Sequence, residues 1–197
     1  SIFVALELLS IPAYMMAAWR KRSSVSNEAG VKYYLLGVFA SAIMLFGMSY
    51  LYGTTGTTKL VDIGAELTNG DLLGLEVVGI AFILVGFAFK VSAVPFHTWA
   101  PDTYEGAPTP VTAFLSVASK AAGFVALVTL VYTAFPDASD VYGPMIWLMA
   151  ALTMTVGNVL ALVQTKLKRV MAYSSVAHSG YLMPGLIAGP AVLAAPL

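Results

Sequence analysis

Long apolar runs constrain this chain more than any other sequence feature. About six of them follow one another, each close to the ~20 residues that a helix needs to cross a bilayer. The chain is 59% hydrophobic and 10% charged, with a mean hydropathy of +0.84. Soluble domains carry roughly 25% charged residues, so a water-soluble core could not hide this much apolar surface. We therefore predict an all-α, polytopic transmembrane helix bundle of about six spans.

The charges between the runs predict how the chain crosses the membrane. The expected spans cover residues 2–19, 33–52, 72–105, 110–135, 143–165 and about 166–190. Basic side chains favour the cytoplasmic side, and those of the first and fifth loops are Arg20, Lys21, Arg22, Lys32, Lys166, Lys168 and Arg169. The polar loop at 53–71 and the acidic loop PDASD are then outside. This alternation requires residues 72–105 to cross the membrane once.

The third expected span is too long for one simple crossing. Its 34 residues would extend about 50 Å as a continuous helix. Pro95 imposes an extended conformation on Val94, which predicts a long half at 72–91, a helix break and a short half at about 96–105. Such breaks occur where protein or a wet cavity satisfies the backbone, and transporters use them for ion sites. A proline kink packed against neighbouring helices is the alternative.

Four ionisable residues on different spans reach similar depths in the membrane: Glu7, Lys90, Lys120 and His178. A charged side chain at the centre of a membrane helix costs about 2.5–3.5 kcal/mol, so this coincidence indicates function. We interpret the four as a proton relay. Each also has an ordinary explanation: Lys90 could extend to the interface, Lys120 could form a structural ion pair with Glu7, and His178 could be a packing residue.

Lysine and serine chemistry suits proton transfer. A buried lysine can be charged at one stage and neutral at another, because burial favours the neutral amine and a nearby carboxylate favours the charged one. Serine hydroxyls, and the waters they hold, can bridge proton carriers. Serines accompany two of the candidates: Ser116 and Ser119 precede Lys120, and Ser174 and Ser175 precede His178.

Other kinds of chemistry are excluded or disfavoured by composition. The absence of cysteine excludes disulfides and thiolate metal sites, and the two histidines are 81 residues apart. A net charge of zero offers no basic surface for nucleic acid. Asp102 and Glu105 follow the helix break, where they could cap helix ends instead of handling protons. The chain starts with Ser1 directly before an apolar run, so we expect an internal fragment of a longer protein.

Four blocks of the sequence resemble one family closely. They read LELLSIPAY, NEAGVKYYLLGVFASAIMLFG, FKVSAVPFHTWAPDTYEGAPTPVTAFLSVASKAAGF and LVQTKLKRVMAYSSVAHSGY. They resemble subunit N (subunit 2), the antiporter-like membrane subunit of the proton-translocating NADH–quinone oxidoreductase, respiratory complex I. The blocks follow the family order and together cover nearly the whole chain. The related Mrp-type antiporters share this plan but usually differ around Lys120.

The resemblance implies a fold of two inverted repeats of five helices, each with one broken helix. Residues 1–135 would form most of the first repeat, and residues 143–197 the start of the second. It also implies a proton relay of Glu7, Lys32, Lys90, Lys120 and His178, in which Lys32 modulates Glu7. Because the second broken helix is absent from this chain, the isolated fragment is not expected to pump.

The same resemblance implies the surroundings of the chain. This chain would bind no cofactor and no metal, because NADH, FMN, iron–sulfur clusters and quinone are handled by other subunits of the complex. Its partners would be the other membrane-arm subunits and the lipid bilayer. The bacterial plasma membrane is the expected location, ahead of a thylakoid or organelle inner membrane. Alternatives are an Mrp-type cation/proton antiporter, a membrane-bound hydrogenase subunit, or a scaffold subunit that does not pump.

Overall fold

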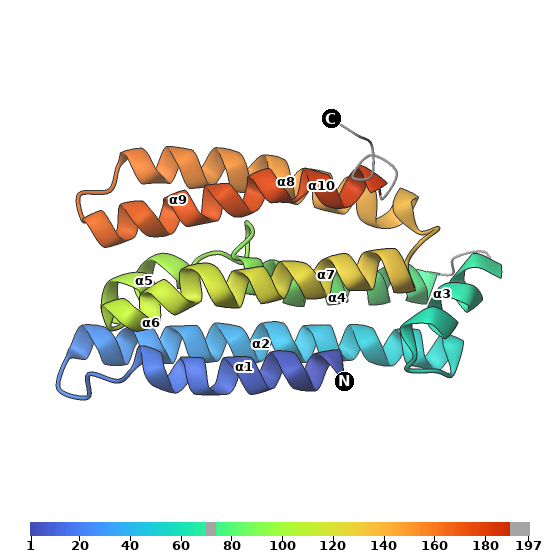
Figure 1. The fold of residues 1–197 in the computed structure, drawn as a ribbon, viewed down its shortest axis with the longest axis horizontal. Helices are drawn as coiled ribbons and strands as arrows, with labels where there is room; N and C mark the ends of the chain where they lie inside the picture. Colours follow the sequence, from blue (N-terminus) through green and yellow to red (C-terminus); the bar gives the residue numbers. More distant parts are fainter. Residues whose placement is uncertain (70–73, 190–197) are drawn as a thin grey trace.

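The computed structural model describes residues 1–69 and 74–189, and every regular element in these ranges is a helix (Figure 1). The helices are α1 (Ile2–Ala17), α2 (Ser24–Thr55), α3 (Leu60–Asn69), α4 (Gly74–Val91), α5 (Trp99–Gly106), α6 (Thr109–Phe114), the π-helical segment η1 (Leu115–Ser119), α7 (Lys120–Ala134), α8 (Ser139–Leu162), α9 (Leu167–Leu182) and α10 (Pro184–Ile187). The predicted all-α bundle is confirmed.

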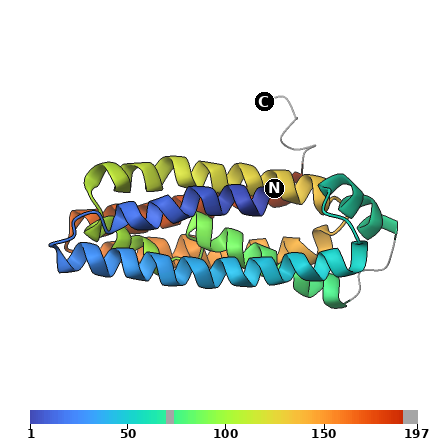
Figure 2. The ribbon, with the colours of Figure 1, turned by 90° about the horizontal axis from the view of Figure 1, so that it is seen from below.

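The long helices run along one common axis in both views (Figures 1 and 2). The turns after α1, α5 and α8 lie at one end of the bundle, and α3 and the turn after α7 lie at the other (Figure 1). Four helical stretches are long and apolar enough to cross a membrane: α2, α4, the continuous α6–η1–α7 and α8. The remaining two expected spans correspond to α1 and α9, each of 16 residues and thus shorter than the ~20 of a full span.

Two details differ from the sequence-based expectation. The region 53–71, expected to be only a polar loop, contains α3, whose buried Ile63 and Leu67 are one helical turn apart. This amphipathic spacing stabilises a short helix against the bundle. The last expected span, about 166–190, does not run through as one helix. Helix α9 ends at Leu182, and Pro184, which has no N–H to donate to the preceding turn, begins the separate helix α10.

The predicted helix break is confirmed and lies in the protein interior. Helix α4 ends at Val91 and α5 begins at Trp99, so residues 92–98 are not helical. The backbone amide of Val94 donates to Thr153 Oγ1 of α8 at 2.9 Å, and Trp99 Nε1 donates to the Phe89 carbonyl at 3.0 Å. Neighbouring side chains thus satisfy backbone groups that the break frees, as a membrane interior requires.

Close helix packing positions α1 against α2. A Cβ atom at Gly37 of α2 would overlap the hydroxyl of Tyr14, so only glycine admits that ring between the two helices. Small residues at such interfaces let the backbones of membrane helices approach closely. The Tyr14 ring then contacts Tyr33 edge-on, with ring centroids 4.6 Å apart. This contact places a tyrosine hydroxyl in the interior, one turn from Ser10.

Candidate functional site

Lys90 lies inside the bundle, with 4% of its surface exposed. It occupies the last turn of α4, directly before the break, where the C-terminal end of the helix dipole favours a cation. Its ammonium donates a hydrogen bond to Ser10 Oγ of α1, and Ser10 donates in turn to the Leu6 carbonyl. The interior hydrogen bond contradicts the alternative that Lys90 extends to the membrane interface.

Glu7 is one turn from Ser10 on α1. Residues three apart share a helix face, so the carboxylate lies on the same side of α1 as the hydroxyl that binds Lys90. Glu7 is half-buried, and Ser41 of α2 donates to its Oε1 at 2.6 Å. The structure therefore brings two members of the predicted relay, Glu7 and Lys90, to one region, connected through α1.

Lys120 is also buried, with 6% exposed, and starts α7 directly after the π-helical segment Leu115–Ser119. π-Helical turns frequently mark functional sites. The ammonium donates to three oxygens of α9: the Ser175 carbonyl at 3.0 Å, Ser175 Oγ at 2.8 Å and Ser179 Oγ at 3.3 Å. An ammonium has three donors, and these bonds use all of them. The alternative of a structural ion pair with Glu7 is therefore wrong.

His178 lies apart from this arrangement. It is exposed on α9, its Nδ1 is 2.7 Å from the Ser174 carbonyl, and its ring meets Tyr181 edge-on at 5.7 Å between centroids. The hydroxyls that bind Lys120 come from the neighbouring positions Ser175 and Ser179. The structure thus places His178 on α9, the helix that binds Lys120, but its Nδ1 contacts the Ser174 carbonyl and not the ammonium.

Lys32 takes part in a different arrangement, which we call the charged cluster. Its members are Glu28, Lys32, Asp102, Glu105, Lys166 and Arg169. Lys32 Nζ is 2.6 Å from Glu28 and 2.7 Å from Asp102. It precedes Ser41, the partner of Glu7, by nine residues on α2, about 13 Å along the helix. The structure therefore places Lys32 with Asp102, away from the Glu7 that the resemblance implies it modulates.

The charged cluster ties the short half-helix α5 to its neighbours at the loop end of the bundle. Arg169 Nη1 of α9 is 2.6 Å from Asp102 and 3.1 Å from Glu105, and Lys166 pairs with Glu105. The hydrogen bond from Lys166 holds the pKa of Glu105 below its ordinary value. A cavity of about 220 Å³ lies between these side chains. The suggestion that Asp102 and Glu105 cap helix ends is thus wrong, because their carboxylates form ion pairs between helices.

The serines that bind the buried groups were only partly predicted. Ser175 was named, whereas Ser10, Ser41 and Ser179 were missed. Ser10 could have been found, because it follows Glu7 by three residues in an apolar helix, and Ser179 follows Ser175 by four. Ser116, which the sequence also indicated, is half-buried and donates to the Ala113 carbonyl one turn earlier.

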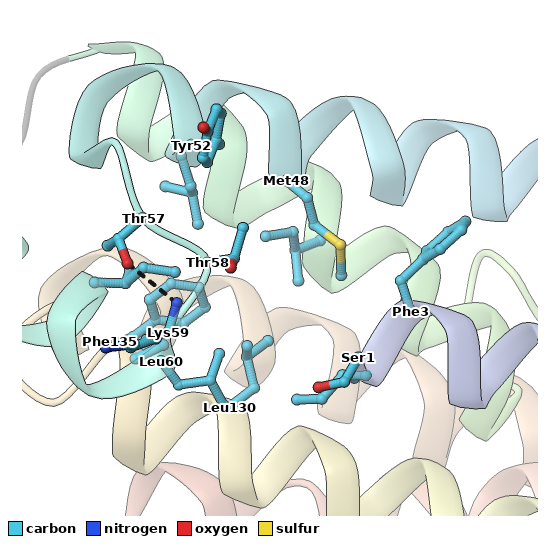
Figure 3. A pocket seen from close by; sticks show the side chains of 15 residues that line it. Ser1, Phe3, Met48, Tyr52, Thr57, Thr58, Lys59, Leu60, Leu130 and Phe135 are labelled. Carbon is cyan, nitrogen blue, oxygen red and sulfur yellow. Dashed lines mark hydrogen bonds between the residues drawn. The ribbon is translucent and has the colours of Figure 1, made fainter.

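A second, larger cavity lies elsewhere. It has a volume of about 460 Å³ and is lined by Ser1, Phe3, Met48, Tyr52, Lys59 and ten further residues, drawn in Figure 3. Lys59 is the basic side chain of this lining, and its backbone amide donates to Thr57 Oγ1 at 3.2 Å. None of the predicted relay residues lines this cavity, so it forms no part of the relay. Within residues 1–69 and 74–189, no three His, Asp or Glu side chains gather as a metal site.

Comparison with known proteins connects this geometry to a family. The family model described as "NADH:quinone oxidoreductase/Mrp antiporter, TM" matches residues 1–195. The chain belongs to this family. Its relative in Trichlorobacter lovleyi, NADH-quinone oxidoreductase subunit N, is 48% identical over 193 residues, which are 97% of this chain and 40% of the relative. The chain thus spans about two fifths of the length of that relative.

Solved structures of family members share the fold. Respiratory complex I from Thermus thermophilus with bound aureothin contains a chain that matches 96% of this one, with a TM-score of 0.79 and 41% identity. The Mrp complex from Dietzia matches 94%, with a TM-score of 0.83 and 25% identity. This chain covers 40% and 34% of those chains, respectively. The backbone resembles both, whereas the sequence is nearer to the complex I subunit.

Proposed function

We propose that this chain is part of a proton-translocating, antiporter-like membrane subunit of a bacterial NADH–quinone oxidoreductase. The observation that carries the proposal is the pair of buried lysines, Lys90 and Lys120, on different helices beside a helix break. Each ammonium is held by uncharged serine or carbonyl oxygens of another helix. The 48% identity to a subunit N supports the choice of complex.

Uncharged partners suit a lysine that must release its proton. A carboxylate in direct contact would favour the ammonium form and oppose proton release. A serine oxygen stabilises the ammonium less than a carboxylate does, and the serine O–H can donate to the neutral amine once the proton has left. Glu7 lies one turn from Ser10 and adds a negative charge near Lys90, while its Oε1 accepts from Ser41 and the ammonium donates to Ser10. Changes in that charge can then load or unload Lys90.

The proposal also covers the surroundings of the chain and its place in the larger fold. Redox chemistry with NADH, FMN, iron–sulfur clusters and quinone would belong to other subunits, and the partners of this chain would be neighbouring membrane-arm subunits in the bacterial plasma membrane. Residues 1–135 would supply most of the first inverted repeat, and 143–197 the start of the second. His178 would continue the relay toward that second repeat. Lys32 would act on the relay through Asp102, its partner in the structure.

Two alternatives have specific observations behind them. An Mrp-type antiporter is favoured by the TM-score of 0.83 but opposed by an identity of only 25%, against 41% for the complex I chain. A non-pumping scaffold is suggested by the interhelical hydrogen bonds of the lysines, because polar contacts commonly join membrane helices. The scaffold differs in one testable respect, since neutral hydrogen-bonding replacements should preserve its function.

The decisive experiment replaces Lys120 with Gln in the full-length chain, assembled in the complete complex in sealed vesicles. Quinone reduction and proton uptake are recorded together, with Lys59→Gln, an exposed lysine at the far end of the bundle, as the control. We expect both activities to fall by about 100-fold, as for loss of a positioned proton carrier, while the control is unaffected. Unchanged turnover and unchanged protons per electron in an assembled Lys120→Gln complex would favour the scaffold.

A further inference from the structure

The turn between α1 and α2 carries three consecutive basic side chains, which we call the basic turn: Arg20, Lys21 and Arg22. It lies at the loop end of the bundle (Figure 1). All three residues are exposed, and in the part of the chain that the structure describes none of them forms an ion pair. By contrast, the cations of the charged cluster at the same end pair with carboxylates. Three positive charges are therefore available to an anion from outside the described residues.

The backbone of the basic turn is held in place by the first turn of α2. Ser26 is fully buried, and its Oγ donates to the Ala17 carbonyl at 3.0 Å. Asn27 Nδ2 donates to the Lys21 carbonyl at 3.1 Å. Because these bonds fix the backbone, the three basic side chains lose little backbone freedom when they bind one ligand together.

An apolar stripe on α1 leads to the basic turn. Val4, Leu8, Ile11 and Met15 are spaced by four, three and four residues, which places them on one face of the helix. Trp19 follows Met15 by four residues, and the side chains of all five residues are strongly exposed. Tryptophan is enriched where the hydrocarbon of a bilayer meets the headgroups. The stripe is therefore at the depth of acyl chains, and the basic turn is at the depth of headgroups.

We propose that the apolar stripe and the basic turn form a binding site for an anionic phospholipid. An acyl chain lies along the stripe, and Arg20, Lys21 and Arg22 hold the phosphate. Guanidinium groups bind phosphate oxygens in pairs, and an ammonium adds a point charge. A zwitterionic headgroup brings its own cation, so this site selects lipids by the net charge of the headgroup. The inference goes beyond the proposed function and does not depend on proton translocation.

A lipid fits this face of α1 better than another helix does. The stripe consists of large side chains, whereas close helix contacts in membranes use small ones, as at Gly37 between α1 and α2. A covering helix would also need carboxylates at the level of the basic turn to match three cations. Anionic headgroups of the cytoplasmic leaflet supply negative charge at that level, and each nearby Lys or Arg contributes about fivefold in affinity.

The test uses the complete complex with the full-length chain, reconstituted in phosphatidylcholine vesicles that contain a trace of photoreactive phosphatidylglycerol. Parallel vesicles carry the same photoreactive group on phosphatidylcholine, and mass spectrometry measures labelling of the peptide that contains Met15 and Trp19. We expect phosphatidylglycerol to label this peptide more strongly, and Lys21→Gln to lower the preference about fivefold. The matched control is Lys168→Gln, which removes one cation from the same end of the bundle and should leave the preference unchanged.

Several results would overturn the lipid site. Equal labelling by the two probes would show that the headgroup charge is not selected. Equal losses in the two variants would show a general effect of surface charge. A cross-link from the stripe to another helix, without lipid labelling, would show that protein covers this face. Should Lys21→Gln prevent assembly, the parent complex decides: the preference should disappear in about 1 M salt, which screens charges beyond about 3 Å, and a preference that persists there overturns the proposal.

Discussion

Four lysines of this chain form two pairs that differ in their partners. In the interior, Lys90 and Lys120 donate to serine hydroxyls and a carbonyl. In the charged cluster, Lys32 and Lys166 pair with the carboxylates of Asp102 and Glu105. The interior lysines are at most 6% exposed, whereas the side chains of Lys32 and Lys166 are 44% and 67% exposed.

This distribution is the reverse of what electrostatic stability alone would favour. A buried charge is most costly without a counter-ion, so a purely structural lysine in the interior should pair with a carboxylate. The carboxylates of the charged cluster are instead used at the loop end, where water already solvates the ammonium groups. Under the proposed function, the interior lysines would exchange protons, whereas the ion pairs of the cluster lysines hold α5 in place.

The largest effect should come from giving Lys120 the kind of partner that the cluster lysines have. Ser175→Asp places a carboxylate against the ammonium, which should stabilise its charged form and prevent proton release. We expect proton uptake by the complete complex in vesicles to fall by about 100-fold. The matched control is Ser175→Asn, which is similar in size and uncharged. If both variants lose activity equally, space at this position matters and charge does not.

A smaller effect is expected from weakening the charged cluster. Asp102→Asn removes the carboxylate that Lys32 and Arg169 share, and leaves two cations close together. Because these side chains are partly exposed, the expected loss of stability is about 1 kcal/mol, the upper end for ion pairs near a surface. Thermal unfolding of the purified complex measures it. Proton uptake should change far less than in Ser175→Asp, and an equal loss would contradict the division between the two groups.

The smallest effect is expected from Lys166→Gln, which removes an exposed partner of Glu105. We expect a loss of roughly 0.5 kcal/mol or less, since the pair is largely solvated. The Lys166 hydrogen bond lowers the pKa of Glu105 in the folded protein, so its contribution is present above the unfolded pKa of about 4.5 and is lost as pH falls through the lower folded value. The difference in stability between variant and parent should therefore vanish in strong acid. A difference that persists there would assign the effect to packing.

Several features could be predicted because their causes are local. The membrane location follows from apolar runs, and the break between α4 and α5 follows from Pro95 together with the loop charges. Helix α3 was missed although its pattern was visible, because its spacing of Ile63 and Leu67 was outweighed by the surrounding polar residues. The end of α9 before Pro184 was missed for a similar reason, since the apolar composition continues past the proline.

The sequence predicted the buried ionisable residues of the candidate site, but not the residues that bind them. Lys90 and Lys120 were identified because a charge within an apolar helix is costly wherever the helix packs. Lys32 was assigned to Glu7 by resemblance, and the structure instead places it with Asp102. His178 was placed on the same path as Lys120, and the structure leaves it exposed on α9. Neither outcome has a signal in the local sequence.

The sequence by itself determined that this protein is a membrane-spanning helical bundle with a broken helix and with lysines in its interior, because composition, helix length and proline geometry act over a few turns of chain. Only the tertiary structure decided that Ser10 of α1 binds Lys90 of α4 and that Ser175 of α9 binds Lys120 of α7. Those residues are separated by 80 and 55 positions. Which helix faces which is set by packing of the whole bundle, and the partners of the lysines follow from that packing.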